Sequence, residues 1–232
     1  MSEKRIAIIE DDPFIGKYLT IILRKNGYSP LSIVDNATAA IRLFENEKPD
    51  LLLTDFNLSE SSSSQRNEAL SLYKTANIPV VVFSSHDKDF LTKSFPSFIP
   101  DAILCKPSTV DEICSTIGFC LTKSEFIKNS QQNISEPFYN YPIPINEVLY
   151  IRQKQKGFQI RTHSSALDLD SDPEVFLQHF PPNQFFAINA NTWVNLAHVK
   201  TMTSSLIYTE NEVLNFDFSF VRKWLFNERN SR

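Results

Sequence analysis

The stretch Ile6-Ala7-Ile8-Ile9-Glu10-Asp11-Asp12 decides the fold of the N-terminal half of this chain. Four apolar residues run directly into three acidic ones, and Leu51-Leu52-Leu53-Thr54-Asp55 repeats the pattern with one aspartate. Short runs that are almost wholly apolar predict strands of a parallel sheet, because both faces of such a sheet are buried. Ligands of these sheets bind beyond the carboxyl ends of the strands. We therefore expect Glu10, Asp11 and Asp55 to meet in one cleft.

Three carboxylates in one cleft repel each other, and a hard divalent cation relieves that repulsion. Mg²⁺ is the natural candidate, because it needs only one or two carboxylates and keeps several waters. Such a site leaves room for a phosphoryl group beside the metal. The acidic strand ends therefore predict a Mg²⁺ site that works on phosphate.

The rest of the first half alternates strands with helices. Asp12 suits the N-cap of the first helix and Pro13 its first turn. Further strands are expected at 29–34, 78–83 and 102–105, and helices at 14–25, 37–46 and 109–122. This alternation predicts a doubly wound α/β fold with five parallel strands.

Two more polar groups follow predicted strands. Ser84 follows Val82-Phe83, and Lys106-Pro107 follows Leu104-Cys105. A hydroxyl and an ammonium at these strand ends can bind phosphoryl oxygens. With this set complete and in order, residues 1–122 resemble the receiver domain of two-component response regulators, which has a flavodoxin-like fold.

The resemblance implies a role for each position. Asp55 would accept a phosphoryl group from a sensor histidine kinase, with Mg²⁺ held by Glu10, Asp11, Asp55 and the backbone carbonyl of Asn57. Ser84 would be the switch hydroxyl and Lys106 the phosphoryl-binding lysine, with a cis peptide before Pro107. The family is not enzymatic beyond slow self-dephosphorylation, and phosphorylation is expected to promote a homodimer.

Composition bounds the remaining possibilities. A chain of 232 residues allows two domains, and 42% hydrophobic with 22% charged residues is ordinary for a globular protein. The sequence has no long apolar run, so membrane insertion is not expected. Three cysteines without metal-ligand spacing favour a reducing, cytoplasmic location.

The second half has a different pattern. Residues 123–137 are polar and predict a linker between a receiver domain at 1–122 and an effector domain at 138–232. In that domain, strands are expected at 148–151 and 158–162 and within 185–196, a hairpin joins 201–208 to 213–218, and helices cover 173–179 and 220–226. This predicts a smaller, mostly-β domain.

Two segments of this half are similar to the LytTR domain. They are 146–151 and 185–196, and Phe185, Ile188, Val194 and Asn195 match its signature. The LytTR family is β-rich, reads the DNA major groove through loops, and acts as dimers on paired half-sites. The resemblance implies a transcription regulator whose output is switched by phosphorylation.

The chain also departs from the LytTR pattern. Ala187, Asn189, Ala190 and Phe220 stand where the family tends to carry basic or polar contact residues, and residues 138–232 hold nine basic and nine acidic residues. The remaining candidates for DNA contact are Lys154, Lys156, Arg161, His163, Asn189, Asn191, Lys200, Arg222 and Lys223. An alternative therefore stays open, in which the LytTR-like domain binds protein and the chain is a signalling adaptor. An acid-cluster phosphatase is disfavoured, because position 57 is Asn and not a second aspartate.

Overall fold

The computed structural model describes residues 3–55, 71, 73–85, 99–129, 143–170, 184–203 and 205–230, the last five without side chains. Contacts between residues divide the chain into two compact units, Met1–Ser124 and Glu125–Arg232.

The N-terminal unit is built on five parallel strands. They are β1 (Lys4–Ile9), β2 (Tyr28–Val34), β3 (Leu51–Thr54), β4 (Val80–Ser84) and β5 (Ala102–Cys105). Their order in space is β2-β1-β3-β4-β5. Because β2 and β3 lie on opposite sides of β1, the chain reverses direction across the sheet between β1 and β3, which is where such folds bind ligands. The predicted flavodoxin-like fold is confirmed.

The described residues of this unit include the helices α1 (Pro13–Lys25) and α2 (Ala37–Glu47) and most of α5 (Val110–Asn129). Residues 71 and 73–75 are also helical. Asp12 caps α1 as expected, because its Oδ1 accepts hydrogen bonds from the backbone N–H groups of Phe14, at 2.8 Å, and Ile15. The predicted end of α5 at residue 122 is wrong. The helix continues to Asn129 because residues 123–129 include no Gly or Pro to stop it.

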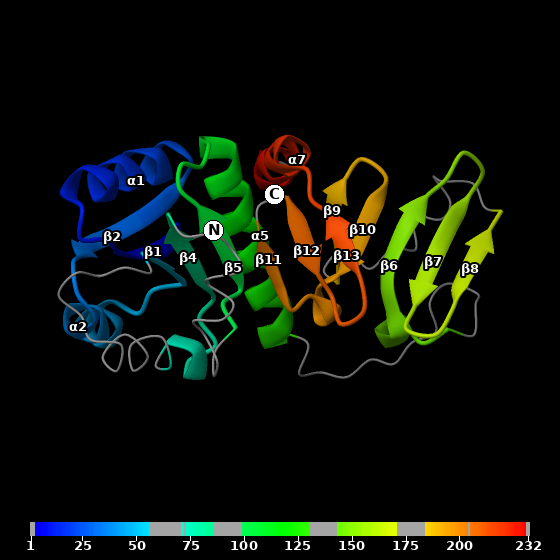
Figure 1. Ribbon diagram of the computed structural model, residues 1–232, viewed down its shortest axis with the longest axis horizontal. Coiled ribbons are helices and arrows are strands. Elements are labelled where there is room, and N and C mark those ends of the chain that lie inside the picture. The colour runs from blue at the N-terminus through cyan, green and yellow to red at the C-terminus, as the bar shows by residue number, and fades with distance from the viewer. Residues whose placement is uncertain are drawn as a thin grey trace. The chain divides into compact units, whose positions relative to one another are not determined.

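Helices cover both faces of the sheet. Alternate side chains of β1 point to opposite faces, and Ala7 and Ile9 pack in one cluster with Ala40 and Leu43 of α2. Figure 1 shows α1 and α2 on opposite sides of β1 and β2. The strand core is therefore buried on both faces, and the polar site is left at the strand ends.

The C-terminal unit contains a five-stranded antiparallel sheet. A 3₁₀ turn, η1 (Ile145–Glu147), leads into β6 (Val148–Gln153), β7 (Phe158–Thr162), β8 (Ala166–Leu169), β9 (Phe185–Asn189) and β10 (Thr192–Asn195). The order in space is β8-β7-β6-β10-β9. This sheet confirms the mostly-β prediction. The helix expected at 173–179 lies outside the described residues.

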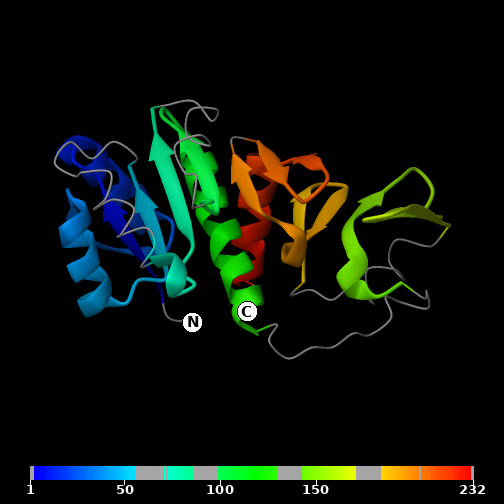
Figure 2. The same cartoon turned by 60° about the horizontal axis from the view of Figure 1, so that its bottom comes forward.

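Three shorter strands form an antiparallel ribbon beyond this sheet (Figures 1 and 2). A second 3₁₀ turn, η2 (Leu196–His198), leads into β11 (Thr201–Thr203), β12 (Leu206–Tyr208) and β13 (Val213–Asn215), and α7 (Phe218–Asn230) follows. The expected hairpin between 201–208 and 213–218 is partly wrong. Ser205 takes a left-handed φ of 53° and breaks the first arm into β11 and β12, so only β12 pairs with β13.

The end of the chain differs in length from its prediction. The terminal helix α7 is longer at both ends than the expected 220–226. Asp217 Oδ1 accepts a hydrogen bond from Phe220 N at 2.9 Å, which satisfies the start of the helix. Among the described residues, no helix combines the length and apolarity needed to cross a membrane.

Candidate functional site

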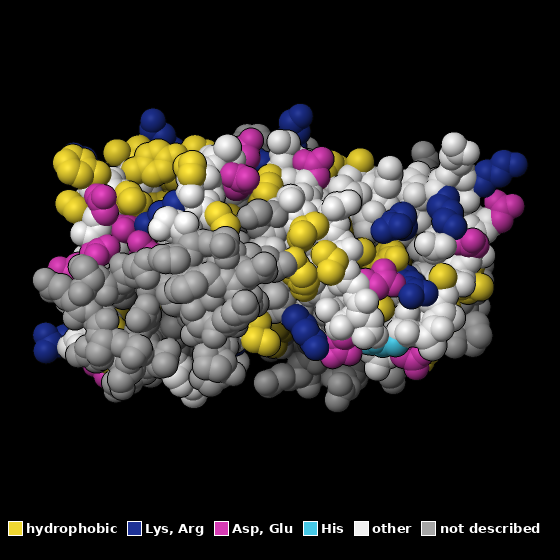
Figure 3. All heavy atoms as spheres, in the orientation of Figure 1, with side chains coloured by type: hydrophobic (Ala, Val, Ile, Leu, Met, Phe, Trp, Pro, Cys, Tyr) yellow, Lys and Arg dark blue, Asp and Glu magenta, His cyan; other side chains and the backbone are white. Residues whose placement is uncertain are grey.

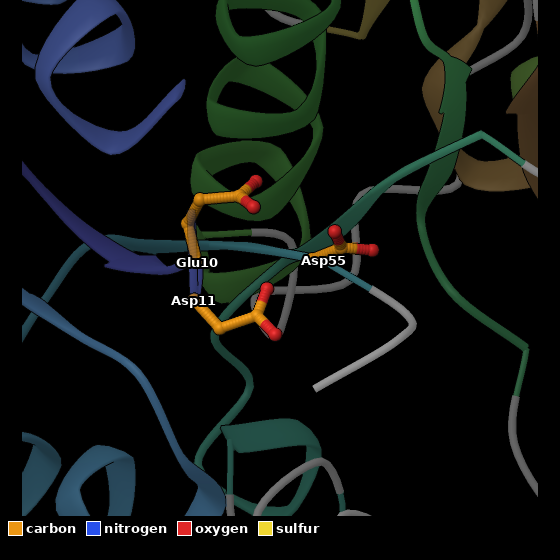
Figure 4. A group of neighbouring side chains, drawn as sticks. All are labelled: Glu10, Asp11 and Asp55. Atoms are coloured by element: carbon orange, nitrogen blue, oxygen red, sulfur yellow. The ribbon is translucent and has the colours of Figure 1, made fainter. Parts of the chain in front are cut away.

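Three carboxylates meet at the carboxyl ends of β1 and β3. Glu10, Asp11 and Asp55 each offer an oxygen within 4.8 Å of those of the other two. The backbone fixes this arrangement, because Asp55 N donates to Ile9 O at 2.8 Å and so ties the end of β3 to the end of β1. Figure 4 shows Glu10 and Asp11 leaving the same strand end, beside Asp55. Separations of this size suit oxygens that share one small cation.

Lys106 reaches the same cluster from the end of β5. Its Nζ donates to Glu10 Oε2 and to Asp55 Oδ2, each at 2.7 Å. The side chain is 15% exposed, against 1% for Glu10 and 12% for Asp55. One largely buried ammonium therefore bridges two of the three acids, and the cluster keeps a net negative charge.

Burial and ion pairing act together on the protonation of these groups. Burial raises the pKa of the Glu10 carboxyl, and the hydrogen bond from Lys106 only partly opposes this. Burial works to lower the pKa of Lys106, but the hydrogen bonds to Asp55 and Glu10 outweigh it and raise that pKa overall. The Lys106 ammonium is thus held in its charged form. Burial disfavours the charged form of Glu10, and a further cation would stabilise it.

The other predicted receiver positions lie at neighbouring strand ends. Ser84 is the last residue of β4 and is fully buried, and its backbone carbonyl accepts a hydrogen bond from Lys106 N at 2.7 Å. The peptide between Lys106 and Pro107 is cis, as expected. Asn57 lies outside the described residues. The Asp12 side chain caps α1, and its backbone N–H donates to Glu10 Oε1 at 3.4 Å.

The nucleic-acid candidates separate into two groups at opposite ends of the β6–β7 hairpin. At the turn between these strands, Lys154 and Lys156 lie near the β9–β10 turn, because Gln153 N donates to Asn191 O at 2.8 Å. At the far end of β7, His163 and Lys200 share Glu210 as a partner, and Arg161 pairs with Glu212 of the same turn. Arg222 and Lys223 belong to α7.

Most of these candidates already have partners within the domain. Lys154 Nζ lies 2.8 Å from Asp168, and Arg161 is paired with Glu212. The Asn189 side chain donates to Asn215 O and accepts from Asn191 N, so it holds the β9–β10 turn together. On the face drawn in Figure 3, basic and acidic side chains are interspersed over the C-terminal half. The described residues on that face therefore form no uniform basic patch.

Sequence reasoning did not identify two groups that shape this surface. Glu210 contacts both His163 and Lys200, and Glu212 contacts Arg161. These acids belong to the β12–β13 turn, about fifty positions from β7 in the chain, and no local pattern signals the pairing. Asn195, which matches the LytTR signature, is structural, since its buried side chain donates to Val148 O at 2.8 Å and accepts from Ala197 N at 3.1 Å.

A five-stranded doubly wound sheet with an acid cluster at its switch point, and a lysine from β5 bridging two of the acids, defines a receiver-type domain. Residues 6–118 match the response regulator receiver domain, and residues 140–215 match the LytTr DNA-binding domain. The chain belongs to the response regulators that join a receiver domain to a LytTR domain.

Individual relatives resemble it to different extents. The sensory transduction protein LytT of Bacillus subtilis is 20% identical over 220 residues, which cover 90% of each chain. The phyllosphere-induced regulator PhyR of Methylorubrum extorquens is 28% identical over 117 residues, and the match spans 50% of this chain but only 43% of PhyR. The solved CheY-like receiver protein from Methanospirillum hungatei aligns at 24% identity with a TM-score of 0.48, covering 53% of this chain and 98% of its own.

Proposed function

We propose that this response regulator accepts a phosphoryl group from a sensor histidine kinase on Asp55 and controls transcription by binding DNA through its LytTR domain. The observation that carries the first half of the proposal is the acid cluster. Three carboxylate oxygens lie within 4.8 Å of one another, and Lys106 bridges Glu10 and Asp55.

The residues fit Mg²⁺ as the metal of this site. Glu10, Asp11 and Asp55 supply hard oxygen ligands, and the backbone carbonyl of Asn57 is proposed to complete the set. Each carboxylate has two oxygens, so Lys106 and a metal can be bound to the cluster together. When bound, Mg²⁺ supplies positive charge for the oxygens of the transferring phosphoryl group.

The chain's own groups would then carry the transfer. A carboxylate oxygen of Asp55 attacks phosphorus, and the donor histidine nitrogen leaves. Lys106 exchanges its hydrogen bond to Asp55 for one to a phosphoryl oxygen while keeping Glu10. The Ser84 hydroxyl, at the end of the neighbouring strand β4, donates to another phosphoryl oxygen.

Phosphate-affinity electrophoresis with a small phosphodonor tests this assignment. The wild type should give a retarded band with Mg²⁺ and none with EDTA, and Asp55→Ala should give none in either condition. Asp35→Ala, which removes an exposed aspartate outside the cluster, should behave like the wild type. An equal retarded band in Asp55→Ala would remove the assignment.

An exposed apolar stripe on α1 supports a protein as the phosphodonor. Phe14 is 82% exposed, and Tyr18 and Ile21 follow at helical spacing, each 44% exposed. Figure 3 shows hydrophobic side chains over α1. Because α1 begins two residues after Asp11, a kinase domain docked on this stripe would stand next to Asp55. Phe14→Ser should slow transfer from the kinase and leave labelling by the small phosphodonor unchanged.

DNA binding is supported by the family of the second domain, and a signalling adaptor is the alternative. The partnered cations and the neutral charge of residues 138–232 favour the adaptor. Salt-titrated binding to random and selected duplexes separates the two, since phosphate contacts make affinity fall steeply with salt. Absence of binding at low salt would favour the adaptor.

The remaining parts of the proposal concern organisation. We propose a receiver domain at 1–122, an effector domain at 138–232, and a homodimer promoted by phosphorylation. The linker predicted at 123–137 is shorter than expected, because α5 continues through residues 123–129. The three cysteines are reduced thiols, which suits the proposed cytoplasmic location. Sedimentation of the chain with and without a phosphodonor tests the dimer.

A further inference from the structure

The turn between β12 and β13 holds two glutamates in fixed positions. Thr209 N donates to Glu212 O at 3.0 Å, and Thr209 Oγ1 accepts from Glu212 N at 3.1 Å. Thr209 itself is buried. The turn is thus closed by its own hydrogen bonds, and Glu210 and Glu212 project from a rigid support.

Both glutamates meet cations from other segments. Glu212 pairs with Arg161 of β7, while Glu210 lies 3.6 Å from Lys200 Nζ and 3.9 Å from His163 Nδ1. The basic side chains of Arg161, Lys200 and His163 are 34%, 52% and 36% exposed. They remain at the surface, within reach of a ligand, but their charge is offset by one acidic turn.

We propose that Glu210 and Glu212 act as an intramolecular counter-charge, which competes with DNA phosphates for Arg161, His163 and Lys200 and so sets the DNA affinity of the LytTR domain. This inference rests on the proposed DNA-binding function. The β12–β13 turn, which the sequence predicts only as a hairpin connection, would then control how tightly the domain binds DNA.

The physical basis is that phosphates and carboxylates are alternative partners for the same cations. Ion pairs at this exposure are weak, so a polyanion can displace the glutamates. The DNA phosphates must nonetheless compete with the glutamates for the basic side chains. The displaced carboxylates also stay near the phosphates and repel them. Basic side chains that are already neutralised by the glutamates bind DNA phosphates more weakly. This lowers both the affinity for DNA and its dependence on salt.

Neutralising the turn tests the proposal in the full chain. Glu210→Gln with Glu212→Gln keeps the side-chain shape and removes two negative charges. With a fluorescent random-sequence duplex, we expect about tenfold tighter binding near 50 mM salt. The slope of log affinity against log salt should steepen by about two, as for two additional phosphate contacts.

A second double variant controls for net charge. Glu45→Gln with Asp170→Asn makes the same change in net charge at two exposed positions, and neither carboxylate belongs to the ion pairs that hold the described DNA-contact candidates. Because neither change releases a candidate cation, its gain should stay within about twofold at the same salt. Equal gains in the two double variants would overturn the proposal, since the effect would then be one of total charge.

The remaining outcomes are also decisive. If the wild type binds DNA and the glutamine variant binds no more tightly, the counter-charge is refuted and the DNA-binding function stands. If no variant binds even at the lowest salt, both are refuted. Tryptophan fluorescence melts check that each variant is folded, and Glu210→Gln alone, which leaves the Arg161 pair intact, should still give a gain of about threefold.

Discussion

Replacing Lys106 with methionine removes the ammonium that bridges Glu10 and Asp55 and keeps a side chain of similar length. The variant takes away the ammonium that lies 2.7 Å from an oxygen of Glu10 and 2.7 Å from an oxygen of Asp55. Removing one member of a buried ion pair costs about 3–5 kcal/mol. Because Lys106 is 15% exposed and not fully buried, we expect the lower end, about 3 kcal/mol, in the absence of Mg²⁺.

Urea titration at neutral pH with EDTA measures this loss. Far-UV circular dichroism follows α1, α2 and α5 of the N-terminal unit, whereas both tryptophans, Trp193 and Trp224, lie in the C-terminal unit. With a denaturant slope of about 2 kcal/mol/M, the dichroism midpoint should fall by about 1.5 M. The fluorescence midpoint should move much less.

A second lysine of the same unit provides a matched control. Lys74 Nζ lies 3.0 Å from Asp101, but its side chain is 44% exposed and Asp101 keeps Lys123 at 3.2 Å. Lys74→Met should therefore cost less than about 1 kcal/mol. Saturating Mg²⁺ should restore more stability to Lys106→Met than to the wild type, because the metal then replaces the missing cation. Equal midpoint shifts in the two methionine variants would refute the reasoning.

Three further outcomes follow from described contacts. The pKa of Glu10 is raised in the folded protein, so the protonated carboxyl favours folding below its ordinary pKa near 4.5. This contribution to stability is lost as pH rises through the raised pKa. Glu10→Gln should remove this pH-dependent loss of stability in metal-free thermal melts and should weaken Mg²⁺ binding. Asn195→Ala should cost about 2–3 kcal/mol by tryptophan fluorescence, because it strands the buried carbonyl of Val148. Gly157→Ala should cost at least about 2 kcal/mol by the same assay, because Gly157 has a φ of +71° and a Cβ would lie 1.8 Å from Leu169 O.

The sequence predicts the acid site well because topology determines it. In a parallel sheet, residues that follow the strands must gather at one edge, so Glu10, Asp11 and Asp55 are brought together once the strands are recognised. Strand recognition is reliable here because the runs at 6–9, 51–54 and 102–104 are buried on both faces.

The effector surface is predicted less well for a physical reason. Arg161 and Glu212 are separated by 51 positions and meet only because the β12–β13 turn comes to the end of β7. A list of basic residues drawn from sequence contains no information about such partners. The break at Ser205 is missed similarly, since a single left-handed residue divides β11 from β12 without glycine or proline to mark it.

The contrast between the two sites suggests that the residual charge of a cluster, rather than the number of like residues in it, indicates its ligand. In the receiver domain, three carboxylates and the Lys106 ammonium leave two negative charges, which matches a divalent cation. In the effector domain, Arg161 and Lys200 are balanced by Glu210 and Glu212, and only a protonated His163 leaves a positive charge. The first cluster therefore attracts its ligand as it stands, whereas the second must give up internal ion pairs before it can bind a polyanion.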